Sequence, residues 1–374
     1  MKHIDCNPIS PEFRNYKPKL NSKHQLISNL SFEKLKSNLT TNVEPDKNLK
    51  LKNYLTTNVE PDLVEPDKVE PDLNLSKIFY AYKGYIIGDL IYLLYDKYDL
   101  AICEKMIINK NTIIQNKKGS IGQCSEYVIL INYLIKYIMK MKKFDENDLY
   151  LLYLEYIKNN HIYYNSELKK LFSGLKTVRG YKNRYKTLDI NNSDETLNRA
   201  FPYILLKYIN PEYMYHIIET DVRCSNRNEY NIEIQKLYLK ILEAIIDEKI
   251  SIFFLRELDI QNIDIKNILT IAIDEEYNSE NIQKFKSIKI LYAFYICIYS
   301  LVCALNGERN IFNILYKIKD ANKYFSIVSC LLSIYLQSKN IDNIFNICIN
   351  SNYIDSKIEY DKNYHPINII NFFL

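Results

Sequence analysis

Only seven of the 374 residues are glycine, and this scarcity limits the folds open to the chain more than any other feature. Glycine supplies the positive φ angles of tight turns and lets a backbone approach a phosphate group closely. A chain with so few glycines is poorly suited to β-sandwiches rich in tight turns, to glycine-rich phosphate loops and to the dinucleotide-binding fingerprint. These classes of protein are therefore excluded.

Apolar residues recur at helical spacing from Lys77 onward, and no sustained alternation of period two is present. This periodicity is typical of amphipathic helices. Helices are expected over residues 125–141, 148–157 and 232–247, with Asp145 or Asn147 as a cap for the second. A basic loop near residues 176–190 and two prolines punctuate the series. The predicted fold class is all-α.

Two strongly apolar segments raise the question of a membrane. Residues 290–305 are apolar or aromatic except for Ser300, and residues 326–336 are apolar again. A spanning helix needs about 20 such residues, whereas shorter runs usually form buried core helices. We therefore expect these segments in the centre of a helical bundle, with no membrane partner.

The first 75 residues differ from the rest. Residues 39–46 read Leu-Thr-Thr-Asn-Val-Glu-Pro-Asp and recur at 55–62, and Val-Glu-Pro-Asp follows twice more, at 64–67 and 69–72. Each proline removes an N–H donor and favours extended backbone before it. We predict a low-complexity tail over 1–75, which is either a tolerant linker or a docking motif, and a helical domain over 76–374.

Charge, cysteine and histidine usage fit an intracellular protein. The formal net charge is +4, eight cysteines include no C-x-x-C pair, and five histidines form no zinc pattern. No secretory signal is recognised at the start. We expect a cytoplasmic monomer without a nucleic-acid partner. The AT-rich residue usage would suit a large DNA virus, and hence the host cytoplasm, or a parasite.

Three segments are similar to the motifs of one protein family and follow one another in the same order. Residues 84–89 (Gly-Tyr-Ile-Ile-Gly-Asp) match G-x-x-x-G-D, residues 193–202 are similar to S-N-G-x-x-M-R-x-x-P, and residues 320–333 begin like D-x-D-T. Residues 121–130 fall where T-D-D-T-Q would stand. Over about residues 77–340 the chain resembles the ADP-ribosylglycohydrolase family, whose fold is a single all-α domain.

The resemblance implies a chemistry. Members of the family use two Mg²⁺ ions, held by carboxylates, to cleave the glycosidic bond at C1″ of ADP-ribose, so ADP-ribose or an ADP-ribosylated protein is the implied partner. Carried onto this sequence, the implied catalytic residues are Asp320 and Glu126, and the implied metal ligands are Asp320, Asn322 and Gln123. The implied ligand-binding residues are Asp89, Ser125, Asp194, Glu195, Arg199 and Arg179.

The sequence departs from the family at the metal motifs. Gln123 and Cys124 replace the early aspartates, and Asn322 and Lys323 replace the last aspartate and threonine of D-x-D-T. Mg²⁺ prefers hard, charged oxygen ligands. Either the dinuclear centre is lost, or one metal is held by Asp320 and Asn322 with Asp89 or Glu126. The expected function is hydrolysis of ADP-ribose glycosidic bonds, or binding without turnover. A catalytically inactive helical scaffold is the alternative.

Several residues have a second interpretation. Asp320 could be a helix N-cap instead of a ligand, and Arg199 could pair with Glu195, four residues before it. Asp194 and Glu195 could line a pocket or face solvent. Residues 169–186 carry seven basic side chains and no acid. They are either a solvated loop or a phosphate-binding segment, which would use Arg179, Lys182 and Arg184 for phosphates and Tyr181 and Tyr185 for stacking, as in a nucleic-acid binder.

Two pairs of small residues predict a close helix contact. Gly84 and Gly88 lie one turn apart in an otherwise bulky helical segment, where each glycine costs about 1 kcal/mol relative to alanine. Close approach of another helix is the usual compensation. Ser329 and Ser333 repeat the spacing late in the chain.

Overall fold

The computed structural model describes residues 73–95, 99–108, 115–116, 119–120, 125–141, 143–159, 167–188, 193–277 and 280–337, together with residues 341, 342, 345, 369 and 373. The chain divides into two units, Met1–Lys68 and Val69–Leu374, and all the described residues belong to the second. The repeats of the predicted tail lie outside the described residues.

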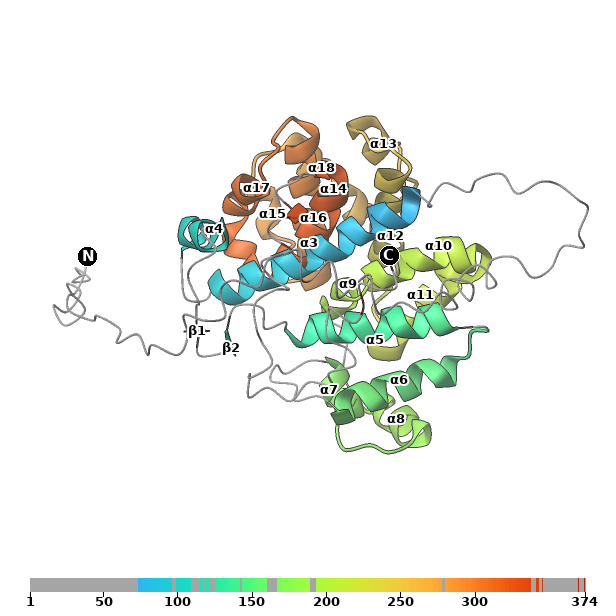
Figure 1. The fold of residues 1–374 in the computed structure, drawn as a ribbon. Coiled ribbons are helices and arrows are strands. Elements are labelled where there is room, and N and C mark those ends of the chain that lie inside the picture. Colours follow the sequence, from blue (N-terminus) through green and yellow to red (C-terminus); the bar gives the residue numbers. More distant parts are fainter. Residues whose placement is uncertain are drawn as a thin grey trace, which may run out of the picture. The chain divides into compact units, whose positions relative to one another are not determined.

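The described part of the chain is helical, which confirms the predicted all-α class (Figure 1). The α-helices are α3 (Leu73–Tyr95), α4 (Leu100–Ile108), α5 (Glu126–Lys140), α6 (Glu146–Asn159), α7 (Glu167–Phe172), α8 (Val178–Tyr185), α9 (Glu195–Asn198), α10 (Leu206–Ile209), α11 (Met214–Ser225), α12 (Glu229–Ile246), α13 (Ile252–Arg256), α14 (Ile263–Asp274), α15 (Glu280–Gln283), α16 (Lys289–Leu305), α17 (Ile311–Lys317) and α18 (Phe325–Leu336). The 3₁₀ helices are η2 (Phe201–Leu205), η3 (Pro211–Tyr213) and η4 (Lys319–Tyr324). Two short strands, β1 (Gln115–Asn116) and β2 (Gly119–Ser120), form an antiparallel pair.

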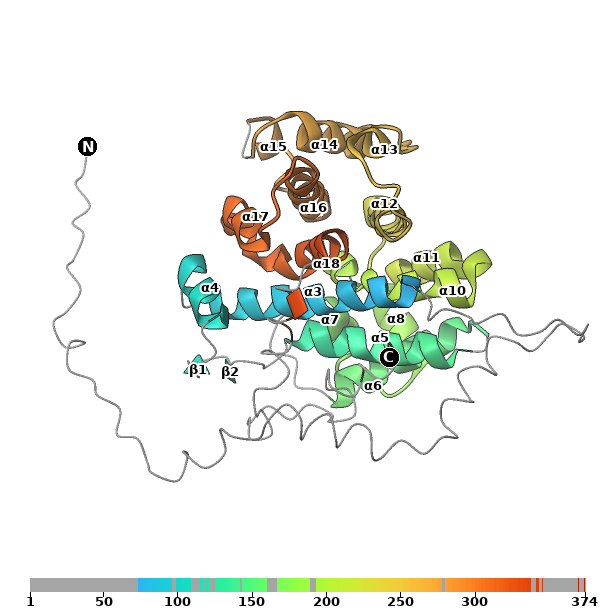
Figure 2. The same cartoon turned by 45° about the horizontal axis from the view of Figure 1, so that its top comes forward.

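Helix α3 crosses the middle of this unit, with α5 and α6 on one side of it and α12, α14 and α16 on the other (Figures 1 and 2). Helix α18 packs along α3. A Cβ added at Gly84 would lie 2.2 Å from the carbonyl oxygen of Ser329, and one at Gly88 would lie 2.2 Å from that of Phe325. The two backbones therefore touch where the glycines stand, as the spacing of small residues predicts.

Helices α16 and α18 form the centre of the core. In α16, Ile290, Phe294 and Leu301 are buried, and in α18 almost every residue is buried. Among the described helices, none is long and apolar enough to cross a membrane. The prediction that these apolar segments are core helices is confirmed.

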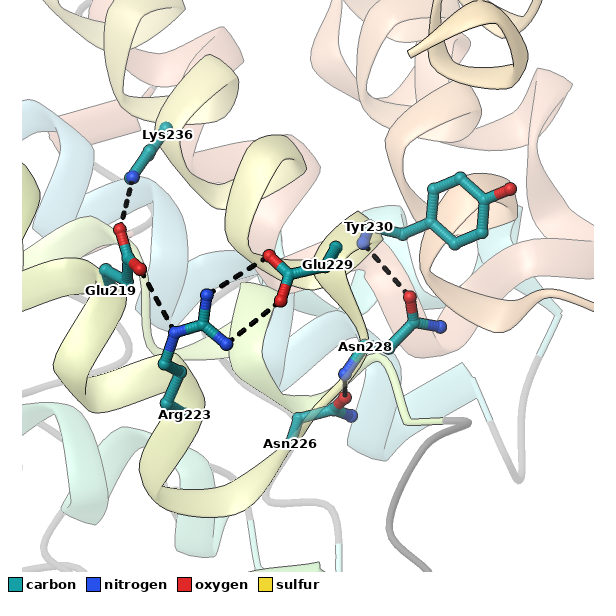
Figure 3. Close-up of polar contacts among 7 residues, drawn as sticks. All are labelled: Glu219, Arg223, Asn226, Asn228, Glu229, Tyr230 and Lys236. Carbon is teal, nitrogen blue, oxygen red and sulfur yellow. Dashed lines mark hydrogen bonds and ion pairs between the residues drawn. The ribbon is translucent and has the colours of Figure 1, made fainter.

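A turn between α11 and α12 is fixed by surface charges (Figure 3). The guanidinium of Arg223 donates from Nε to Glu219 (3.0 Å) and from Nη1 and Nη2 to the two carboxylate oxygens of Glu229 (2.9 and 3.2 Å). Lys236 donates to the other oxygen of Glu219 at 2.7 Å. Asn228 caps α12 by accepting from the backbone N–H of Tyr230 at 3.0 Å. These contacts bridge α11 and α12 at the surface, and the buried face of α11 is described below.

The basic run does not form the predicted loop. Residues 178–185 form helix α8, capped by Thr177, whose hydroxyl accepts from the N–H of Gly180 at 3.1 Å. Arg184 donates from Nη1 to the carbonyl of Ser173 at 2.6 Å and thereby caps the end of α7. The many charges of this run obscure a short amphipathic segment whose apolar side is buried.

Candidate functional site

The first predicted site residue, Asp89, lies on α3 and holds the start of α5. Its carboxylate accepts from the backbone N–H of Ser125 at 2.8 Å and from the Ser125 hydroxyl. That hydroxyl in turn accepts from the N–H of Tyr127 at 3.2 Å, so Ser125 is the N-cap of α5. Burial raises the pKa of Asp89 to about 6, although the hydrogen bonds from Ser125 act in the opposite direction. Both carboxylate oxygens of Asp89 are engaged inside the protein.

Asp194 is paired with a lysine from the other end of the sequence. The Lys323 ammonium donates to Asp194 Oδ2 at 2.7 Å, and the Tyr324 hydroxyl donates to the same oxygen at 2.6 Å. Burial alone would raise the pKa of Asp194, but the charge of Lys323 and these hydrogen bonds outweigh it and lower the pKa below its ordinary value. The Lys323 ammonium group therefore neutralises a predicted ligand-binding carboxylate.

Arg199 pairs with Asp221, and the suggested ion pair with Glu195 is wrong. Arg199 Nε donates to Asp221 Oδ2 at 2.8 Å, and Nη2 donates to the Asp221 carbonyl at 3.1 Å and to the Ser225 hydroxyl. Tyr153 donates to the second carboxylate oxygen of Asp221. Burial alone would lower the pKa of Arg199. Its neighbours, chiefly the Asp221 carboxylate, together outweigh this effect, so the pKa is raised overall and the guanidinium stays charged.

The sequence contains a signal for Asp221 that lies outside the family motifs. In α11 the buried residues include Ile217, Ile218, Asp221, Val222 and Ser225, which recur at helical spacing. A carboxylate on the apolar side of an amphipathic helix needs a buried partner, because an isolated charge in the core is very costly. That position therefore predicts a buried cation, and Arg199 supplies it.

Glu126, Glu195 and Arg199 come together around one small cavity. Its volume is about 10 Å³, and its lining consists of Glu126, Tyr127, Leu130, Tyr156, Leu168, Glu195 and Arg199. Glu195 Oε2 accepts from the backbone N–H of Glu167, the first residue of α7, at 2.8 Å. Burial raises the pKa of Glu195 to about 7. Glu195 thus lines a cavity far smaller than an ADP-ribosyl group, and its role in ligand binding stays a prediction.

Asp320 and Asn322 lie in η4 and do not line this cavity. Asp320 is exposed and Asn322 is half-buried. Helix α18 begins at Phe325 and has Tyr324 at its N-cap position, so the alternative that Asp320 caps this helix is wrong. Arg179 is exposed on α8 and does not line the cavity.

The basic run also supplies no stacking surface at Tyr181. The Tyr181 ring is buried and stacks on Phe172 with 4.5 Å between ring centroids. Its hydroxyl donates to the carbonyl of Cys224 at 2.6 Å. Tyr181 is therefore a core residue, and the suggestion that it stacks on a base is wrong.

The described oxygen donors do not fit a magnesium ion. Among the residues that the structure describes, no three His, Cys, Asp or Glu side chains lie together in a way that could hold a metal. Both carboxylate oxygens of Asp89 accept hydrogen bonds from Ser125, and Asp194 accepts one from the Lys323 ammonium group. Gln123, the third implied metal ligand, lies outside the described residues.

Comparison with known proteins gives a likeness at the level of the fold. No family model matches the sequence, and no curated protein matches it. A solved structure of an "ADP-ribosylglycohydrolase-related protein complex" aligns with 74% of this chain and 96% of its own chain, with a TM-score of 0.48 and 11% sequence identity. Substrate and activity do not carry over from that protein at this similarity.

Proposed function

We propose that this helical domain binds an ADP-ribosyl group without a metal and does not hydrolyse it by the two-metal route. The observation that carries the proposal is the ion pair between Lys323 and Asp194, whose nitrogen and oxygen lie 2.7 Å apart. Lys323 stands at the threonine position of the implied late metal motif. Its ammonium group repels a divalent cation from the carboxylate that it neutralises.

The contacts among the motif segments support a ligand site. Ser125 joins the start of α5 to α3, and Lys323 joins η4 to the segment before α9. These two contacts join segments that are far apart in the sequence and that carry residues implied by the resemblance. Carboxylates accept hydrogen bonds from hydroxyl groups such as those of ribose, and an ammonium group donates charge-assisted hydrogen bonds to phosphate oxygens.

The described residues include no group of side chains that could hold a metal, and this favours binding over hydrolysis. In the implied reaction the metals position the ribose hydroxyls and a water, and they stabilise the charge that develops at C1″. Lys323 can supply one fixed positive charge, but it cannot orient several oxygen ligands in octahedral geometry. The proposal is therefore recognition of an ADP-ribosylated target without turnover.

Calorimetric titration of ADP-ribose into the full chain, with Mg²⁺ and with a chelator, tests the proposal. We expect equal affinity in both conditions and no release of ADP-ribose from an ADP-ribosylated protein. Replacing Lys323 by glutamine should weaken binding about tenfold, the cost of one charge-assisted hydrogen bond. The control Lys266→Gln changes an exposed lysine on α14 and should leave the affinity unchanged.

Two results would contradict this function. Binding or hydrolysis that requires Mg²⁺ would show that a metal site forms after all. No binding under either condition would remove the ligand site and favour a helical scaffold.

A further inference from the structure

The guanidinium of Arg199 is buried but only partly satisfied. Arg199 is 1% exposed, and its Nε and Nη2 atoms are hydrogen-bonded to Asp221 and Ser225. Nη1 is buried and has no hydrogen-bond partner among the described residues. An unsatisfied buried donor on a charged group is costly, so native proteins seldom leave one without a partner.

The small cavity lies next to Arg199, whose Nη1 atom is the unsatisfied donor. Nε and Nη2 share one edge of the planar guanidinium, and this edge faces Asp221, so Nη1 points away from the ion pair. Arg199 also lines the small cavity between α5, α6, α7 and α9, together with Glu126 and Glu195. Arg199 therefore shares the lining of one small cavity with two acidic residues.

The size and lining of the cavity identify the occupant. Its volume of about 10 Å³ corresponds to roughly one water molecule and excludes a phosphate, a sugar or a nucleotide. A buried water typically makes about three hydrogen bonds to polar groups that would otherwise lack partners. Arg199 supplies a donor, and Glu195, which lines the same cavity, supplies an acceptor.

We infer that the cavity is a water site, in which one ordered water accepts a hydrogen bond from Arg199 Nη1 and donates one to the Glu195 carboxylate. Placed between a guanidinium and a carboxylate, the water dipole is favourably oriented toward both. Glu195 Oε2 already accepts from the N–H of Glu167 at 2.8 Å, and the carboxylate has lone pairs left for the water.

The water connects elements that are separate in the sequence. It extends the buried pair of Asp221 and Arg199, on α11 and at the end of α9, to Glu195 and through it to the first N–H of α7. The start of α7 is thereby tied to the buried charges of the core. This role requires no ligand and is independent of the proposed function.

A high-resolution crystal structure of the full chain tests the water site directly. We expect one peak of water density within about 3.2 Å of both Arg199 Nη1 and a Glu195 carboxylate oxygen. In solution, NMR should show cross-relaxation between the Arg199 guanidinium protons and a long-lived water. The guanidinium of Arg223, which is exposed and bonded to Glu219 and Glu229, is the control and should show none.

Two substitutions separate the water from the side chains around it. Glu195→Gln keeps an acceptor of similar size and should retain the water signal. Glu195→Leu removes the acceptor, and the signal should be lost. A cavity without density, an ion in it, or an Nη1 atom bonded directly to a carboxylate would overturn the water site, as would a water signal that survives in Glu195→Leu.

Discussion

At the scale of single residues, Asp221 is the group on which the buried charge of Arg199 depends. Both side chains are at most 1% exposed. We expect Asp221→Asn, which keeps the shape and removes the charge, to lower the free energy of unfolding by about 3–5 kcal/mol, because it leaves a guanidinium without its counter-charge. Urea unfolding followed by circular dichroism measures this change.

The surface ion pairs of Arg223 provide a matched control. Arg223 has the same guanidinium group and two carboxylate partners, but its side chain is 46% exposed. Exposed pairs contribute less than about 1 kcal/mol, so Arg223→Ala should change the free energy of unfolding by no more than that. Equal losses in Asp221→Asn and Arg223→Ala would contradict the argument from burial.

The sequence predicts which segments contact one another better than it predicts which side chains pair. The spacing of Glu195 and Arg199 suggests an i, i+4 pair, but α9 ends at Asn198, and Arg199, just beyond it, pairs with Asp221. Asp320 precedes a helix in the sequence, yet it lies inside η4, and Tyr324 takes the N-cap position of α18. Such choices depend on local backbone geometry that a motif does not specify.

At the scale of elements, the contact between α3 and α18 requires glycine. A Cβ at Gly88 would meet the backbone of Phe325 and Ser326, which cannot turn aside as a side chain can. We expect Gly88→Ala to destabilise the protein by about 1–3 kcal/mol through overpacking, despite the better helix propensity of alanine. Thermal unfolding measures the loss.

Gly180 tests the same substitution without the helix contact. In α8 its Cβ would meet only the ends of two side chains, at 3.3 and 3.4 Å. Gly180→Ala should therefore leave the stability unchanged or raise it by up to about 1 kcal/mol. If Gly180→Ala and Gly88→Ala destabilise equally, the close backbone contact is not the cause.

Helices could be predicted well where an apolar face is continuous. The expected segments 125–141, 148–157 and 232–247 correspond to α5, α6 and α12, and Asp145, one of the two candidate caps, accepts from the N–H of Asn147 at 2.8 Å. The prediction for the basic run was wrong because its charges outnumber its apolar residues. Burial of Tyr181 and the docking of Arg184 on α7 are tertiary effects that periodicity does not report.

At the scale of the whole molecule, two buried carboxyl groups link folding to pH. Burial raises the pKa of Asp89 from 3.8 to about 6 and that of Glu195 from 4.5 to about 7. Between these values the folded protein retains protons that the unfolded chain releases, so their contribution is present at low pH and is lost as pH rises. For each group, a difference of one between its pKa in the folded and unfolded states changes the free energy of unfolding by about 1.4 kcal/mol.

We therefore expect the free energy of unfolding to fall by about 2–6 kcal/mol as pH rises from about 4.5 to about 7.5. Asp194 acts in the opposite sense, because its pKa is lowered and its contribution is lost only as the pH falls through that lowered value. Urea unfolding at a series of pH values measures the slope. Asp89→Asn and Glu195→Gln should each flatten it, even if either also lowers stability at every pH. The exposed Glu212→Gln is the control. A slope that both buried variants leave unchanged would show that Asp89 and Glu195 are not the groups that release these protons.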